Sequence, residues 1–360
     1  MSALGQVSVR ETHGVRRFLY PLSAEIDLAG LPSSDQVTLA SPDGRTIPVQ
    51  VSPLDHRNPG RIRLDFAVSL APYEKLQLAL SSDQSAAAFE DPLNVTVGKT
   101  FRIAQRRFVT EFDKKSMLHQ VVYDGVRHLT CPSALTRNGE TMAMTADPDL
   151  SAGPLAARIR ASGSYGDGCD AETRLQTTAC KSWVVLRHLL LQPRASDEIV
   201  FHLQLAAVSP VLTADFGVGG GIYGKLEAGG SEELSWQSDF PRRGTIRWSI
   251  SAGDRTDYTG EVKTSDEYAA QRWFHLIDRG KSLAVAVTDV PGACREMTVK
   301  LRSDGAVQIR FGLGESDSGP AVFGVCCHFL NNIPALAAAT NPQSILLPPL
   351  VEVSPGFRGE

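Results

Sequence analysis

The sequence lacks both long apolar runs and an excess of positive charge. No apolar run approaches the roughly 18–20 residues that span a membrane, and residues 1–14 contain no apolar core of the kind a signal peptide needs. The formal net charge is -4 and the pI is near 6.1. This charge offers no general attraction to nucleic acid or to an anionic membrane. Together these absences favour a cytoplasmic protein that binds neither nucleic acid nor a membrane.

Cysteine is scarce, and its spacing matches no metal site. The six cysteines form no CxxC pair, and no HxH or HExxH motif is present, so no metal or cofactor is expected. Buried free thiols are the favoured interpretation. A disulfide between Cys169 and Cys180 is the alternative, and it would require an oxidising compartment. The sequence also lacks a GxSxG elbow and a convincing pair of carboxylates, which ranks hydrolysis below elimination.

Short alternating segments, separated by turns rich in glycine, proline and aspartate, run through nearly the whole chain. Alternation with a period of two is typical of strands with one buried face. The sequence therefore predicts an all-β protein without solenoid or propeller repeats. We expect a small N-terminal β-sandwich or barrel over residues 1–82 and a large antiparallel β-super-sandwich over 95–345. Residues 346–360 are expected to form a C-terminal tail along the surface.

Near the middle of the chain, residues 181–208 contain two long apolar runs separated by a short polar break. We interpret them as neighbouring strands of one large sheet and as the floor of the super-sandwich. The first run carries Arg187, and the second carries His202 and Gln204. A purely structural strand pair would not require these side chains. Alternation assigns each residue to a face of its strand but leaves the register between strands open.

A glycine-rich stretch follows at residues 213–230, where seven of eighteen positions are glycine. Its letters match GxGxxG, but no helix pattern follows, which argues against a dinucleotide or phosphate loop. Glycine here favours bulges or the close approach of a backbone or ligand. Tyr223 lies within the stretch and could serve a ligand as an acid or hydrogen-bond donor. A tyrosine that packs beside a bulge is the alternative.

Several segments have the turn-and-strand layout of a known family. The N-terminal segments resemble the small β-domain of exo-rhamnogalacturonan-lyase-like proteins, and the later ones resemble its companion, a galactose-mutarotase-like super-sandwich. The resemblance implies a carbohydrate-active protein of the lyase type. The helical toroid of such lyases is not predicted in this sequence, and no catalytic residue of the family is carried over. The segments are 17–22, 37–51, 63–72, 112–118, 123–125, 157–163 and 272–287.

β-Elimination on a sugar needs a base, a cation that stabilises the enolate, and an acid for the leaving oxygen. Histidine, tyrosine and arginine on predicted strand faces are the candidates for these roles, and aromatic or planar polar side chains are candidates for binding the sugar. Each histidine could instead be a half-buried sheet residue, and each tryptophan a core anchor. The candidate catalytic residues are His119, Arg187, His202, Tyr223 and His275, and the candidate substrate-binding residues are Tyr123, Gln204, Trp236 and Trp273.

These features are consistent with three alternative hypotheses for the function of the protein. The leading hypothesis is a lyase-like enzyme that acts on a carbohydrate in a cleft of the super-sandwich. The second is a non-catalytic subunit that binds carbohydrate or supports assembly. The third is a structural β-protein that forms homo-oligomers through an open sheet edge.

Overall fold

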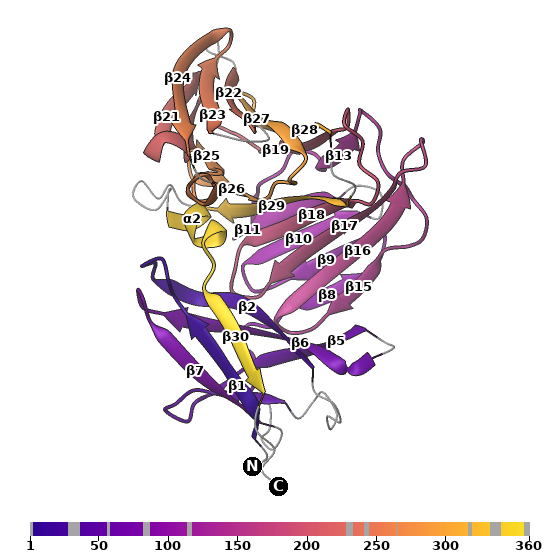
Figure 1. Ribbon diagram of the computed structural model, residues 1–360, viewed down its shortest axis with the longest axis vertical. Coiled ribbons are helices and arrows are strands. Elements are labelled where there is room, and N and C mark those ends of the chain that lie inside the picture. The colour runs from indigo at the N-terminus through magenta and orange to yellow at the C-terminus, as the bar shows by residue number, and fades with distance from the viewer. Residues whose placement is uncertain are drawn as a thin grey trace.

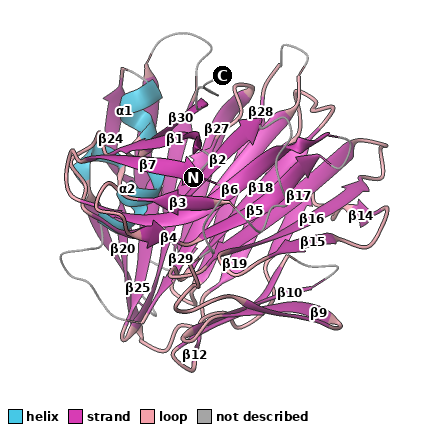
Figure 2. Ribbon diagram, turned by 90° about the horizontal axis from the view of Figure 1, so that it is seen from below, coloured by secondary structure: helices cyan, strands magenta, loops and turns pink. Residues whose placement is uncertain are grey.

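The computed structural model consists of stacked antiparallel sheets (Figure 1). It describes residues 3–27, 37–55, 58–81, 87–113, 117–227, 233–240, 245–263, 265–315, 319–331 and 340–355. In these ranges α-helix is confined to α1 (Ser265–Ala269) and α2 (Thr340–Leu346), as Figure 2 shows. The predicted all-β class is confirmed. Over the same ranges, no helix has the length and apolar character needed to cross a membrane.

A ten-stranded sheet forms the central layer. Its longest strands bury apolar side chains on both faces, as expected for a sheet covered on two sides. In spatial order its strands are β14 (Ala143–Met144), β16 (Ala156–Ser164), β17 (Asp170–Thr178), β18 (Trp183–Leu190), β29 (Ala321–Leu330), β26 (Lys281–Asp289), β25 (Trp273–Asp278), β20 (Val211–Phe216) and β21 (Ile222–Glu227), with β15 (Asp149–Ala152) paired to β16.

The inner face of this sheet packs against two further sheets. Phe216 on β20 meets Trp236 of the seven-stranded sheet, with ring centroids 6.4 Å apart. Phe329 on β29 lies 6.3 Å from Phe108 of the five-stranded sheet. Both sheets therefore close the main core from one side. The seven-stranded order is β13 (Ala134–Arg137), β19 (Glu198–Gln204), β28 (Ala306–Leu313), β27 (Cys294–Arg302), β22 (Glu233–Asp239), β23 (Ile246–Ala252) and β24 (Arg255–Val262); the five-stranded order is β12 (Val126–Arg127), β11 (Leu118–Tyr123), β10 (Phe108–Asp113), β9 (Thr100–Ala104) and β8 (Asn94–Val97).

The outer face of the ten-stranded sheet is partly covered by the N-terminal strands. Tyr20 packs edge-on against Trp183 of β18, with ring centroids 5.7 Å apart. Ala286 and Cys326 belong to the same second core. This unit has two sheets: β30 (Leu350–Pro355), β1 (Ala3–Arg10), β7 (Lys75–Ser81), β3 (Thr38–Ala40) and β4 (Thr46–Ile47), and then β2 (Arg17–Asp27), β6 (Asn58–Leu70) and β5 (Val49–Asp55).

The C-terminal segment, which the sequence predicts as a tail along the surface, contains an edge strand of the N-terminal unit. Strand β30 pairs antiparallel with β1, from Gly5 opposite Pro355 to Arg10 opposite Leu350. The alternation of Val351 and Val353 explains this placement, because both side chains pack against the N-terminal core. The end of the chain therefore returns to its beginning. The division into 1–82 and 95–345 stays a prediction.

Strands β18 and β19 are not neighbours, contrary to the interpretation of residues 181–208 as one strand pair. β18 lies in the ten-stranded sheet and β19 in the seven-stranded sheet. Leu186 of β18 and Phe201 of β19 belong to the same main core. Both strands carry an apolar face, but the intervening turn carries the chain from one layer of the sandwich to the other.

The six cysteines are all free thiols. Cys169 is buried and Cys180 is exposed, so the alternative of a disulfide between them is wrong. Cys326 and Cys327 point to opposite faces of β29, as alternation predicts, and contribute to different cores.

Candidate functional site

Polar side chains form a line across the outer face of the ten-stranded sheet. The register places Tyr223 on β21 opposite Asp215 on β20, and Asp215 opposite His275 on β25. The line continues through Ala284 on β26 to His328 on β29. Adjacent strands lie about 4.8 Å apart, so His275 is a direct neighbour of Asp215. We call Tyr223, Asp215, His275 and His328 the polar row.

The interior of the polar row is buried, and several of its polar atoms have no hydrogen-bond partner among the described residues. Asp215 is 1% exposed and His275 is 0% exposed. Within the described part of the chain, Asp215 Oδ1, both ring nitrogens of His275 and His328 Nδ1 have no hydrogen-bond partner, and neither do the nearby Trp273 Nε1 and Ser282 Oγ. Buried polar atoms in native proteins are nearly always paired with protein or with ordered water. Such a group on one face indicates a place that receives a ligand or water.

Burial strongly changes the acidity of the Asp215 carboxyl group. Burial raises the pKa of Asp215 to about 6, while a hydrogen bond with Tyr223 acts in the opposite direction. The charge of Asp215 in turn raises the pKa of the Tyr223 phenol. Tyr223 is 61% exposed. The pair therefore joins a solvent-facing phenol to a buried carboxyl group that titrates close to neutral pH.

Burial shifts the pKa values of the two histidines in the polar row downward, opposite to the shift of Asp215. Burial lowers the pKa of His275 to about 4. Burial lowers the pKa of His328 to about 3, and the charges of Lys181 and His275 act in the same direction. Both imidazoles are therefore neutral near pH 7, when each ring can donate one hydrogen bond and accept another.

Glycine allows the loop after β20 to approach the row. A Cβ atom on Gly217 would lie 2.3 Å from Trp273 Nε1, so only glycine fits there. The 3-10 turn η2 (Val218–Gly220) follows, and Gly219 has a φ of 68°. Such a backbone conformation is readily available to glycine. The expectation that this stretch permits close approach is confirmed, and its outcome is to place Tyr223 opposite Asp215.

Helix α2 lies against the same face, where it packs on β25, β26 and β29. The N-terminal unit holds this helix by its carbonyl groups. Arg17 Nη1 donates to the carbonyl of Ser344 over 2.5 Å, and Arg17 Nη2 donates to that of Leu347. The hydroxyl of Tyr20 also donates to Ser344. The N-terminal unit and the outer face are therefore linked through α2.

Three of the sequence-predicted site residues come together here: Tyr223, His275 and Trp273. Arg187 shares the outer face but lies apart from the row on β18, where its Nε is 3.1 Å from Asp289 Oδ2. The alternation that groups Arg187 with Trp183 is correct. Whether Arg187 and His202 face one cleft was left open by the sequence; their strands, β18 and β19, belong to different sheets.

His202 and Gln204 line a polar groove on the side of the seven-stranded sheet that faces away from the main core. Its volume is about 290 Å³. Gln204 Nε2 donates to the carbonyl of Asp304 over 2.6 Å, and Lys300 pairs with Glu233 at 3.0 Å. Amide, imidazole and charged groups all line this groove. The groove residues are Cys131, Pro132, His202, Leu203, Gln204, Glu233, Lys300, Arg302, Ala306, Val307 and Gln308.

The remaining candidates lie elsewhere. His119 and Tyr123 are on β11, where a bulge after Leu118 breaks the simple alternation that groups His119 with Val121. His119 Nδ1 is 4.0 Å from Asp113 Oδ2. Trp236 is fully buried in the main core and donates to Ser238 Oγ over 2.9 Å, so its ring packs inside the sandwich rather than on a sugar.

Sequence reasoning missed Asp215 and His328. A usable signal exists: Asp215 alternates with the apolar Ala214 and Phe216, which assigns a lone carboxylate to the face opposite the core. The described residues contain no group of three or more histidine, cysteine, aspartate or glutamate side chains arranged to hold a metal ion.

The fold is similar to that of solved structures. No protein-family model and no curated protein matches the chain. An α-mannosidase from Enterococcus faecalis V583 superposes with a TM-score of 0.62 at 9% identity, covering 97% of this chain and 46% of the mannosidase. An Enterococcus faecalis protein of glycosyl hydrolase family 38 gives a TM-score of 0.59 at 8% identity, covering 98% of this chain and 47% of that one. This chain thus spans less than half of each relative.

A candidate aldose 1-epimerase from Klebsiella pneumoniae superposes less closely, with a TM-score of 0.43 at 10% identity over 72% of this chain and 89% of its own. The resemblance to exo-rhamnogalacturonan lyases stays a prediction. This chain has the antiparallel β-sandwich fold that it shares with part of the α-mannosidase structure.

Proposed function

We propose that this protein is a carbohydrate-active enzyme that works by proton transfer, with Tyr223 in contact with the sugar and Asp215 as the proton acceptor behind it. One observation carries the proposal: the exposed phenol of Tyr223 lies on the strand position directly opposite a buried carboxyl group, that of Asp215, whose pKa is about 6. A pKa near the working pH suits a group that must accept and release a proton in each turnover. The fold shared with an α-mannosidase supports carbohydrate as the substrate class.

The proposed reaction is β-elimination at a uronate residue. Tyr223 Oη takes the proton next to the sugar carboxylate while its own phenolic proton passes to Asp215. The electron pair left on the sugar forms a carbon–carbon double bond as the glycosidic carbon–oxygen bond breaks. Tyr223 donates its proton to the leaving oxygen and recovers the phenolic proton from Asp215. Both side chains end in their starting states.

Lys225 is the proposed partner of the sugar carboxylate. It lies two positions beyond Tyr223 on β21, is exposed, and shares the face of Tyr223 by alternation. Two residues of strand span about 7 Å, which is within reach of a flexible lysine side chain. A cation at this position would stabilise the negative charge that develops on the carboxylate when the proton leaves.

The test is the formation of an unsaturated sugar, measured by ultraviolet absorbance with a panel of uronate-containing oligosaccharides. Tyr223→Phe and Asp215→Asn should each lower kcat/KM by about 100-fold or more, whereas Tyr258→Phe, at an exposed tyrosine on β24, should have no effect. Activity should fall as the pH drops below about 6, because protonated Asp215 cannot accept a proton. Full activity of Tyr223→Phe, or no unsaturated product from any substrate, would contradict the proposal.

The polar groove around His202 favours a second function, carbohydrate binding without turnover. Planar amide groups from Gln204 and Gln308 lie there with imidazole and charged side chains, a set that can form several hydrogen bonds to hydroxyl groups. Calorimetry with the same oligosaccharides separates the two functions. Binding that is weakened by Gln308→Ala, without any unsaturated product from the wild-type protein, would support the second function and reject the first.

A further inference from the structure

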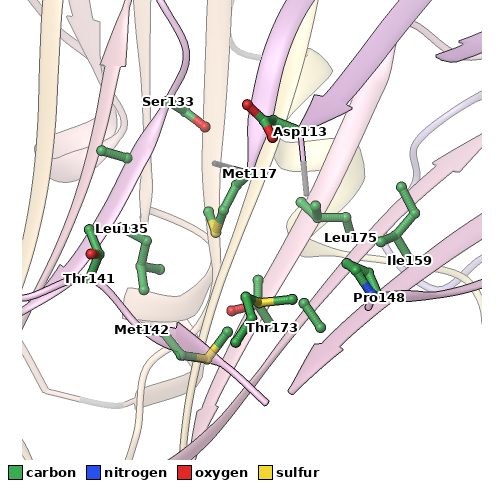
Figure 3. Close-up of a pocket in the computed structure, with 13 residues that line it drawn as sticks. Asp113, Met117, Ser133, Leu135, Thr141, Met142, Pro148, Ile159, Thr173 and Leu175 are labelled. Atoms are coloured by element: carbon green, nitrogen blue, oxygen red, sulfur yellow. The ribbon is translucent and has the colours of Figure 1, made fainter. Parts of the chain in front are cut away.

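An apolar pocket lies where three sheets meet, away from the polar row and from the groove (Figure 3). Its volume is about 100 Å³. Figure 3 shows Met117, Leu135 and Met142 directed into the same space as Leu175 and Ile159. The pocket residues are Asp113, Met117, Ser133, Ala134, Leu135, Thr141, Met142, Met144, Pro148, Ile159, Ala161, Thr173 and Leu175.

The floor of the pocket is buried and offers little to water. Leu135, Ile159 and Leu175 are buried aliphatic side chains. The two buried hydroxyl groups already have partners: Ser133 Oγ accepts from the backbone of Leu118 over 2.9 Å, and Thr173 Oγ1 is 2.9 Å from His188 Nδ1. Water in a space with few free polar partners is held weakly, and an apolar group displaces it favourably.

Half-buried methionines form the rim of the pocket. The sequence contains five methionines, and Met117, Met142 and Met144 line this one pocket. Met297, in contrast, is fully buried in the main core. Methionine side chains are flexible and polarizable, and they are common on surfaces that adapt to apolar ligands. Three of them around one opening are more than the packing of a closed core requires.

The pocket wall depends on a close backbone approach. A Cβ atom on Gly163 would lie 2.2 Å from the carbonyl oxygen of Ala143 and 2.8 Å from Met142 Cγ. Glycine at this position allows β14 to pair with β16 so closely that Met142 closes one side of the pocket. This side of the pocket therefore depends on the glycine at position 163.

We propose that this pocket binds a compact, uncharged, apolar molecule or substituent of about the size of one aromatic ring. Apolar cavities of roughly 150 Å³ accept benzene, and the open, methionine-lined mouth here can adapt to a ring-sized group. Among the described residues that line the pocket, Asp113 is the titratable one, so an anionic ligand of the same shape is disfavoured. The proposal does not depend on the chemistry assigned to Asp215 and Tyr223.

The methionines provide the test. In the full-length protein labelled with ¹³C-methyl methionine, toluene should produce saturable shifts of the Met117, Met142 and Met144 signals. The Met297 signal should stay in place and serve as an internal control. Benzoate, which has the same ring and a negative charge, should produce no saturable shift at the same concentrations. Unchanged pocket signals, or equal shifts of all methionine signals, would overturn the proposal.

Two variants test the pocket itself. Ala161→Leu fills the space, and Gly163→Ala displaces β14 and Met142; each should weaken toluene binding at least about tenfold. Ala152→Leu, at an exposed position on the neighbouring β15, is the matched control and should bind as the wild type does. An unshifted Met297 signal reports that each variant is folded. Unweakened binding in either folded pocket variant would reject this site.

Discussion

Two buried polar clusters on the same side of the ten-stranded sheet differ in how their hydrogen bonds are used. Arg17 donates to Glu11 over 2.6 Å and to the carbonyl groups of Ser344 and Leu347. Burial alone would raise the pKa of Glu11, but hydrogen bonds from Arg17 and from backbone N–H groups lower it below its usual value. In the polar row, by contrast, Asp215 Oδ1 and both nitrogens of His275 have no hydrogen-bond partner in the part of the chain that the structure describes.

The comparison separates a structural role from a functional one. A fully partnered ion pair holds the chain in place, and removing one member is costly because the other is left buried and uncompensated. Unpartnered buried groups weaken the fold, so their presence in a group indicates a function. We therefore expect substitutions in the two clusters to change stability in opposite directions.

The largest effect is expected for Arg17→Met. This change removes the donor to Glu11, Ser344 and Leu347, and it should lower the free energy of unfolding by about 3–5 kcal/mol. Denaturant unfolding at neutral pH measures it. Arg255→Met, which breaks an exposed pair with Asp257, is the control and should leave the midpoint unchanged. Equal effects of the two substitutions would show that the Arg17 cluster does not hold α2 in the way we infer.

A smaller, pH-dependent effect is expected for Asp215→Asn. The pKa of Asp215 is raised from 3.8 to about 6 in the folded protein. The protonated carboxyl group therefore favours folding, and this contribution is lost as the pH rises from about 4 through 6. Two units of pKa correspond to at most about 3 kcal/mol.

Asparagine does not titrate, so Asp215→Asn should gain stability relative to the wild type by up to that amount between about pH 4 and pH 7. Denaturant unfolding of both proteins across this range is the measurement. The neutral histidines act in the opposite direction, because their lowered pKa values make both proteins less stable as the pH falls below about 6.5. They are common to both proteins and cancel in the difference. A difference that is constant with pH would mean that Asp215 is not buried as described.

The smallest effect is expected for His275→Leu. Replacing a buried imidazole that has two unpartnered nitrogens by an aliphatic side chain of similar size should leave the free energy of unfolding unchanged or raise it by about 1 kcal/mol at pH 7. His202→Leu, at an exposed position on β19, tests whether any histidine substitution gives this gain, and it should give none. A clear loss of stability in His275→Leu would place His275 with the partnered cluster.

Side-chain alternation predicted much of the local structure correctly. It placed Trp183, Val185 and Arg187 on one face of a strand, and the structure has them on the outer face. It did not predict that β18 and β19 belong to different sheets, because two apolar strands joined by a short turn fit a hairpin and a change of layer equally well. The same limit applies to β30, because its pairing with β1 joins segments that are distant in the sequence.

The candidate site shows this limit most clearly. Tyr223 and His275 could be named from their residue types and their strand positions. Asp215 lies between them in space, but its importance depends on burial and on pairing with β25, which is distant in the chain. Neither property has a signature within a few residues of Asp215. The apolar pocket is similar, since its residues come from three different sheets and from loops beside them.

The sequence by itself determined the all-β class, the turns and the face on which each strand side chain lies, because these depend on a two-residue period and on local backbone preferences. Only the tertiary structure decided which strands pair, which faces are covered, and which polar atoms are left without partners. Register and layer assignment arise from contacts between distant segments, so the meeting of Asp215, Tyr223 and His275 is a property of the folded sheet.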